Sequence, residues 1–156
     1  MARIIAYPYA NSPISEDDCL LGTQKDQNGT NQTNPTKNFS VGQVVVAGLG
    51  YTAYTALISQ SGTNAPTATV LKNNTGHTYT WTRTAAGKYE ITANGNAFTA
   101  NKTAVFINYG NPSSDGLPPK WVRTSDTLLK VSTQDETAVL DDNILNGAAF
   151  EIRIYS

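Results

Sequence analysis

Residues 77–93, HTYTWTRTAAGKYEITA, decide the fold because their side chains alternate with a period of two. Successive side chains of a β-strand point to opposite faces. Tyr79 and Trp81 therefore share one face of a first strand, and threonines fill the other face. After the turn at Ala-Ala-Gly, KYEITA repeats the pattern with Tyr89 and Ile91 on one face. This stretch predicts an antiparallel β-hairpin.

The same alternation continues on both sides of the hairpin and is broken by turn residues. Such spacing is typical of a sandwich or a barrel. In the last segment Phe150, Ile152 and Ile154 share one face, so we expect the chain to end inside a sheet. Further strands are predicted over residues 103–109, 120–124, 127–133, 136–140 and 150–155.

Composition supports an all-β protein. Charged residues make up 15% of the 156 residues, against roughly 25% in an average domain. Thr, Asn, Ser and Gly take their place, whereas a helical bundle needs more Glu, Lys, Leu and Ala. We expect a small antiparallel sandwich over residues 43–156, preceded by an extended arm over residues 1–42.

Residues 39–50, FSVGQVVVAGLG, leave two interpretations open. Ser40 is a suitable N-cap for a short helix with Val41, Val44, Val45 and Leu49 at helical spacing. Consecutive valines and several glycines weaken that helix. The balance favours a strand by a narrow margin.

The arm contains one short hydrophobic segment between polar stretches. Ile14, Leu20 and Leu21 belong to this segment, and residues 25–38, KDQNGTNQTNPTKN, offer no apolar side chain to a core. An apolar segment within polar chain is typical of a peptide that docks onto a partner. The alternative is a disordered tail with incidental leucines.

Charge and cysteine content narrow the function classes. The formal net charge is −1 and no Lys/Arg cluster is present, so we expect no nucleic-acid partner. Cys19 is the only cysteine and cannot form an internal disulfide, so we expect a protein with a reduced thiol in a reducing compartment. The apolar run in the first residues, MARIIAYPYANSP, is too short for a signal peptide. No segment of the sequence is long and apolar enough to span a membrane. We expect assembly in a cytoplasm.

No arrangement of reactive residues predicts catalysis. His77 is the only histidine, and a strand-edge position explains it. Asp141, Asp142 and Asn143 read as a turn or a helix cap rather than as one half of a glycosidase carboxylate pair. Zinc needs three or four Cys/His ligands, whereas the chain has two such residues. The sequence therefore predicts no enzyme, no metal and no cofactor.

Surface aromatics are the remaining binding signal. Tyr109, Trp121 and Tyr155 are candidates for stacking on a sugar or packing at a subunit contact. Trp81 is better explained as a core residue of the hairpin. Trp121 follows a proline-rich segment, NPSSDGLPPK, and is the better candidate for an exposed contact.

Two sets of motifs resemble a known class of proteins. ISEDDCLLGTQ followed by TKNFSVGQV is similar to the N-terminal anchoring segment of small virion proteins of tailed bacteriophages, crAss-like and related phages among them. YTALISQSGTNAPTATVL and WTRTAAGKYEITANGNAFTANKTAVFI resemble a module that is frequent among phage structural genes. The resemblance covers nearly the whole chain from Ile14 onward.

This resemblance implies a head fibre, a decoration protein or a tail appendage that resides in the virion. It implies a homotrimer with a jelly-roll-like, TNF-like knob, assembled in the bacterial host cytoplasm. Ile14, Leu20 and Leu21 would anchor the arm to capsid or tail proteins. The alternative is a carbohydrate-binding module for host-surface glycans that uses Tyr109 and Trp121. A small cell-wall hydrolase is a third and weaker hypothesis.

Overall fold

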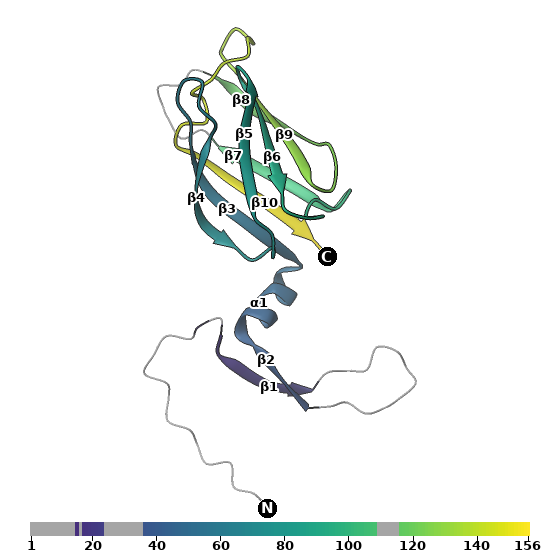
Figure 1. Cartoon of the computed structure of the whole chain (residues 1–156). Helices are drawn as coiled ribbons and strands as arrows, with labels where there is room; N and C mark the ends of the chain where they lie inside the picture. Colours follow the sequence, from purple (N-terminus) through teal and green to yellow (C-terminus); the bar gives the residue numbers. More distant parts are fainter. Residues whose placement is uncertain (1–14, 16, 24–35, 109–115) are drawn as a thin grey trace, which may run out of the picture. The chain divides into compact units, whose positions relative to one another are not determined.

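The computed structural model describes residues 15, 17–23, 36–108 and 116–156. Its chain divides into two compact units, Met1–Leu49 (unit 1) and Gly50–Ser156 (unit 2). Figure 1 shows both units. Ile14 and Tyr109, two of the predicted site residues, lie outside the described residues.

Unit 1 contains a β-hairpin and a helix. Strands β1 (Cys19–Thr23) and β2 (Thr36–Ser40) pair antiparallel, with Leu20 opposite Phe39. Helix α1 (Val41–Leu49) follows β2 directly, and the Val41 N–H donates to the Asp18 carbonyl over 2.7 Å. The described part of the predicted extended arm is therefore a paired hairpin.

The favoured strand over residues 39–50 is wrong, and the helical alternative is observed. The Ser40 hydroxyl accepts a hydrogen bond from the Gln43 N–H, and the Gln43 side-chain oxygen accepts one from the Ser40 N–H. This reciprocal capping box satisfies two donors that a helix start leaves open. Gly50, with φ of +68°, ends the helix in a left-handed conformation. Capping at both ends thus outweighs the low propensity of the valines.

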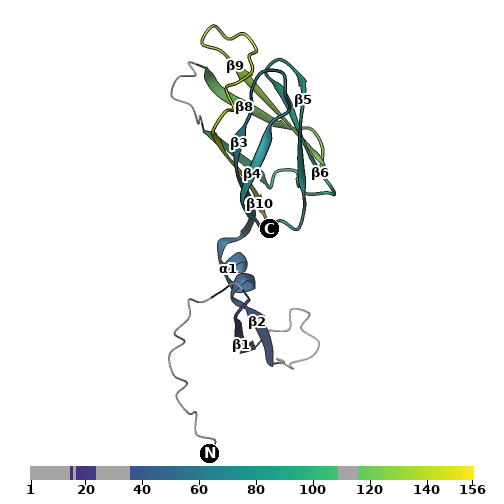
Figure 2. The same ribbon diagram turned by 60° about the vertical axis from the view of Figure 1, so that its left-hand side comes forward.

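Unit 2 is a sandwich of two four-stranded antiparallel sheets (Figures 1 and 2). This confirms the predicted all-β sandwich. The first sheet has the order β4-β3-β10-β7, and the second has the order β5-β6-β9-β8. The strands of the first sheet are β3 (Tyr51–Ser59), β4 (Thr67–Asn73), β7 (Thr103–Asn108) and β10 (Ala148–Tyr155). Those of the second are β5 (Tyr79–Ala85), β6 (Lys88–Ala93), β8 (Leu117–Arg123) and β9 (Leu128–Gln134).

Neighbours along the chain are often neighbours in the sheets. Strands that follow one another along the chain pair as hairpins in both sheets: β3 with β4, β5 with β6, and β8 with β9. The predicted hairpin of residues 77–93 is confirmed as β5 and β6. The C-terminal strand β10 lies inside its sheet, between β3 and β7, as the alternation predicted.

The core lies between the two sheets and is built from alternating positions. Trp81 of β5 meets Phe150 of β10 in a T-shaped contact with ring centroids 4.9 Å apart, which joins the two sheets. Trp81 is buried, so its interpretation as a core residue is confirmed. Other fully buried side chains include Tyr54, Ala56, Ile58, Tyr89, Ile91, Phe98, Leu129, Leu145 and Ile152.

The predicted strand over residues 136–140 is wrong. Only an isolated bridge joins Gln134 to Leu140. The Asp135 carboxylate accepts hydrogen bonds from the hydroxyl and N–H of Thr137 and from the Val139 N–H, and these bonds hold the pKa of Asp135 below its usual value. Ala138 has a φ of +64°. The local aspartate turn thus replaces a sheet ladder.

Candidate functional site

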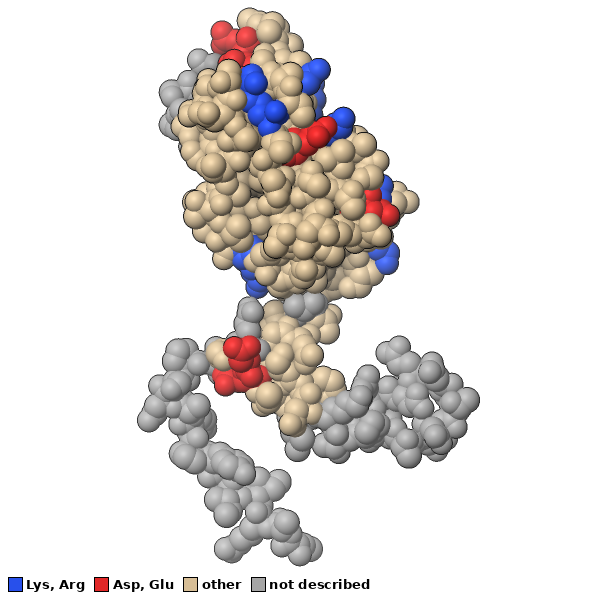
Figure 3. Space-filling view, viewed as in Figure 1, with Lys and Arg blue, Asp and Glu red and all other residues tan. Residues whose placement is uncertain are grey.

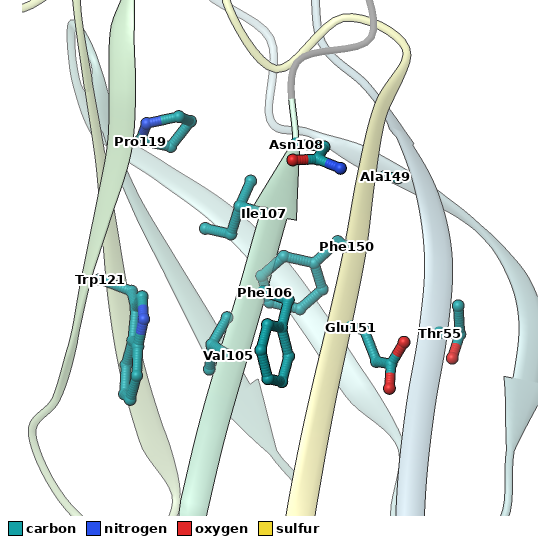
Figure 4. A pocket seen from close by; sticks show the side chains of 10 residues that line it. All are labelled: Thr55, Val105, Phe106, Ile107, Asn108, Pro119, Trp121, Ala149, Phe150 and Glu151. Atoms are coloured by element: carbon teal, nitrogen blue, oxygen red, sulfur yellow. The ribbon is translucent and has the colours of Figure 1, made fainter.

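A groove of about 450 Å³ lies along β7 and β8, the outermost strands of the two sheets on one side of unit 2. Side chains from β3, β7, β8 and β10 line it (Figure 4). Figure 4 shows Val105 and Ile107 on the side of β7 that faces Trp121, and Phe106 on the other side. The groove is a candidate binding site in unit 2.

The aromatic side chains of the groove follow from strand alternation. Trp121 pairs with the buried Val131 and so lies on the inner face of β8, yet 37% of it remains exposed because β8 is an edge strand. Phe106 lies on the outer face of β7 and is 51% exposed. Pro119 adds a third apolar surface beside Trp121. The groove therefore offers apolar surface on both sides of β7.

Polar groups border the outer part of the groove. Glu151 of β10 lies opposite Phe106 in the sheet and accepts a hydrogen bond from the Arg153 guanidinium, which raises the pKa of Arg153. The same guanidinium lies 4.8 Å from the ring centroids of both Phe106 and Tyr51. These cation–π contacts fix Arg153 between two rings. Glu151 thus lines the groove with a carboxylate whose position is fixed by Arg153, and Thr55 of β3 adds a hydroxyl.

A second hollow of about 370 Å³ is lined by residues of β5, β6, β8 and β9. Its ionisable side chains include Glu90 and Lys130, which form an ion pair over 3.3 Å. Trp121 borders this hollow as well as the groove. Figure 3 shows charged side chains few and scattered on the face of unit 2 that it presents. The charged side chains on this face do not form a patch of one sign.

The most ordered polar cluster of unit 2 surrounds Asp142. The Arg83 guanidinium donates three hydrogen bonds to this carboxylate, at 2.7 to 3.1 Å. The Tyr89 hydroxyl donates over 2.7 Å and the Gly87 N–H over 3.1 Å. The hydrogen bonds from Arg83 are the main reason that the pKa of Asp142 falls to about 2, whereas burial chiefly raises the pKa of Tyr89.

This cluster is a structural lock rather than a reactive site. Both carboxylate oxygens of Asp142 accept hydrogen bonds from the chain itself, and the residue is buried. A general acid or base needs a reachable proton and a pKa near the working pH. The predicted turn at residues 141–143 is observed, with Asn143 at a φ of +70°. Its partner Arg83 was missed because the two residues lie 59 positions apart in sequence.

The described parts of the chain also include the single histidine and the single cysteine. His77 Nδ1 lies 3.3 Å from the Asn94 side-chain oxygen, at the end of the β5–β6 hairpin that is opposite its turn. Among residues 15, 17–23, 36–108 and 116–156, no three His, Cys, Asp or Glu side chains are grouped as metal ligands. Cys19 is a free, exposed thiol.

Of the predicted aromatic site residues, the structure describes Trp121 and Tyr155, and these two do not line the same groove. Trp121 lines the groove, whereas Tyr155 is not among its lining residues. The Tyr155 ring instead contacts Tyr51, with centroids 5.3 Å apart. Sequence reasoning missed Phe106, which lines the same groove as Trp121 only because β7 and β8 end up as neighbouring edges. The alternation in TAVFIN places Phe106 and Val105 on opposite faces of one strand. This is the one sequence signal that Phe106 faces away from the core.

Two of the three predicted anchoring residues, Leu20 and Leu21, lie in β1. Leu20 is 49% exposed, and Leu21 pairs with Asn38 in the hairpin. Helix α1 adds further exposed apolar side chains to unit 1, since Val44, Val45 and Leu49 are each nearly half exposed. Sequence reasoning had noted the helical spacing of these residues but not their exposure.

Comparisons with known proteins identify no relative. No protein-family model, no curated protein and no solved structure matches the chain. None of the helices in the described residues is long and apolar enough to cross a membrane.

Proposed function

We propose that the protein is a non-enzymatic structural component of a phage virion, a head fibre or decoration protein. Unit 1 attaches it to the particle and unit 2 is the displayed knob. The observation that supports this division is that unit 1, whose described residues form only a hairpin and a short helix, has an exposed apolar surface. It includes Leu20 on β1 and Val44, Val45 and Leu49 on α1.

The composition of α1 favours a helix that is covered by another chain. Its nine residues, VGQVVVAGL, contain no charge. Isolated helices of this length are marginal in water, and a helix that is apolar on all sides is normally buried. Val44, Val45 and Leu49 are each a little under half exposed, so covering what remains contributes roughly 1 kcal/mol each before ordering costs. Three copies of α1 packed around a common axis supply such cover, which makes a homotrimer our proposed assembly.

The hairpin of unit 1 provides the second contact, with capsid or tail proteins. Leu20 is exposed on β1 and is free to enter an apolar groove of such a protein. Three hairpins in one trimer would act together through their effective concentration. The virion itself, and assembly in the bacterial host cytoplasm, are proposed from the resemblance of the sequence motifs.

The test is incorporation into particles. We expect Leu20→Asp combined with Leu21→Asp to abolish incorporation, because two carboxylates cannot enter an apolar groove. The matched control is Leu57→Asp, since Leu57 is a similarly exposed leucine, at 45%, on unit 2. Normal incorporation of the double variant would contradict the attachment role of β1.

A second candidate function is recognition of host-surface glycans by the β7–β8 groove. The observation that favours it is that the partly exposed ring of Trp121 and the polar groups of Thr55 and Glu151 line the same groove. Such a combination of apolar surface and a few polar groups is typical of small-molecule sites. Binding on a glycan array that Trp121→Ala removes, and Val122→Ala leaves intact, would support this function. A chain that binds none of the capsular sugars would count against it.

A further inference from the structure

Strand β7 has an unpaired edge. Within the described residues its only hydrogen-bonded neighbour is β10, and that register is unbroken from Thr103 to Asn108. In an antiparallel strand, alternate residues direct their N–H and C=O groups to opposite sides. Half of the β7 residues therefore present backbone donors and acceptors to the side away from β10. Such an edge is a template for a further strand.

The other three edge strands of unit 2 carry features that oppose pairing. A register shift interrupts β4, which also carries Lys72. A second shift interrupts β5 at Thr84. Strand β8 has a third shift, together with Pro118 and Pro119. Irregularities, prolines and charges are the devices by which natural edges avoid pairing.

Strand β7 has none of these devices. Its sequence, TAVFIN, contains no proline and no charge, and its register with β10 has no shift. The 450 Å³ groove runs beside it. The edge that is open to pairing is thus also the edge that borders a groove.

The two sides of the groove suit the alternate side chains of an extended peptide. On the inner side lie Val105, Ile107, Pro119 and Trp121, which are apolar. On the outer side lie Phe106 and the polar groups of Thr55 and Glu151. A strand paired with β7 directs every second side chain to each of these sides. Apolar residues would alternate with polar ones in such a strand.

We propose that β7 accepts an extended peptide segment of a partner protein as a fifth strand of its sheet. The peptide is uncharged at its centre and has an apolar side chain at every second position. Backbone hydrogen bonds to β7 supply affinity, and the surface of Trp121 and Pro119 selects the side chains. The proposal goes beyond the attachment role of unit 1, because it concerns a separate surface.

A peptide is favoured over a second copy of unit 2 and over a sugar. Pairing β7 with β7 of another copy would bring two β8 strands together, and Pro118 and Pro119 have no N–H to donate there. A sugar lacks the regular alternation of donors and acceptors that matches the edge of a strand. An extended peptide uses both the backbone of β7 and the apolar wall.

The test begins with the full-length chain on an array of immobilised peptides of about eight residues. In each probe apolar and polar residues alternate, and a control of identical composition has its apolar residues contiguous. The alternating probe that binds best is then made in two forms, N-methylated on one or the other alternate set of residues. We expect one form to bind about tenfold more weakly or worse and the other to keep its affinity, because only one set faces β7.

Trp121→Ala should weaken binding of the same peptide, whereas Val122→Ala, one residue along β8, should leave it unchanged. The chain with Leu20→Asp and Leu21→Asp should also bind normally, which separates this proposal from the attachment role of unit 1. The proposal is overturned if no alternating peptide binds more tightly than about 1 mM, or if both N-methylated forms are weakened equally. Sugar binding without peptide binding, or a dimer of the full-length chain formed through β7, would overturn it as well.

Discussion

Asp142 links two distant parts of unit 2 at the scale of single residues. Its carboxylate binds Arg83 of β5, Tyr89 of β6 and the turn between these strands through the Gly87 N–H. Removing one partner of a buried, hydrogen-bonded charge leaves the other partner unsatisfied, which costs more than the pair itself contributes. The lock therefore stabilises the hairpin that decides the fold.

Asp142→Asn should lower the free energy of unfolding at pH 7 by about 2 kcal/mol. The folded-state pKa of Asp142 is about 2, below its usual 3.8. Its stabilisation is thus complete above about pH 4 and is lost as the pH falls toward 2. Urea unfolding between pH 7 and pH 2 would measure this. The control is Asp126→Asn at the more exposed Arg123 pair, where we expect little change. Equal effects of the two variants would contradict the lock.

Gly87 is held in a conformation and a space that fit no other residue. It has a φ of +58°, and an added Cβ would lie 2.5 Å from the Thr133 carbonyl oxygen and 2.7 Å from the Asp141 nitrogen. We expect Gly87→Ala to destabilise unit 2 by at least about 2 kcal/mol. Gly62→Ala is the control, because Gly62 has a φ of +55° but open space around its Cβ position. Thermal melting of both variants separates steric overlap from backbone strain, and similar melting would argue against the overlap.

At the scale of elements, local patterns predicted the structure where they acted alone. The period-two alternation of β5 and β6 needed no distant partner to be recognised, and β10 was found for the same reason. The segment 39–50 was harder, because the reciprocal bonds of Ser40 and Gln43 offset the weak propensity of the valines. The predicted strand at residues 136–140 failed because Asp135 satisfies the backbone of its own turn.

The candidate site was only partly predictable from sequence. Trp121 was found because it is a large aromatic residue after a proline-rich segment. Phe106 and Glu151 were not, because they reach the groove only through the pairing of β7 with β10. The Arg83–Asp142 pair likewise depends on a contact across 59 residues. Sequence periodicity gives the face of a strand but not its neighbour in the other sheet.

Helix α1 gives a prediction at the same scale. Val44→Asp with Val45→Asp places two charges on a helix that we propose to be covered by two other copies. We expect the variant to remain monomeric while the thermal melting of unit 2 stays unchanged, since the two residues belong to unit 1. Light scattering and circular dichroism would measure both properties. A variant that still associates would show that α1 is not the contact.

At the scale of the whole molecule, the proposed function divides attachment from display between the two units. Unit 2 has a well-formed core, a buried charge lock and a groove beside an open strand edge. Unit 1 has a small hairpin and an uncharged helix with exposed valines. A small unit that exposes apolar side chains needs a partner to cover them. The proposed virion role assigns that cover to two other copies of the chain and to a protein of the particle.

The most direct test of this account is the mass of the full-length chain in solution, measured by light scattering over a range of concentrations. The account predicts three times the 16.7 kDa of one chain, and a single-chain mass for residues 50–156 alone. A full-length chain that stays monomeric at every concentration would contradict the covered helix, and with it the proposed trimer.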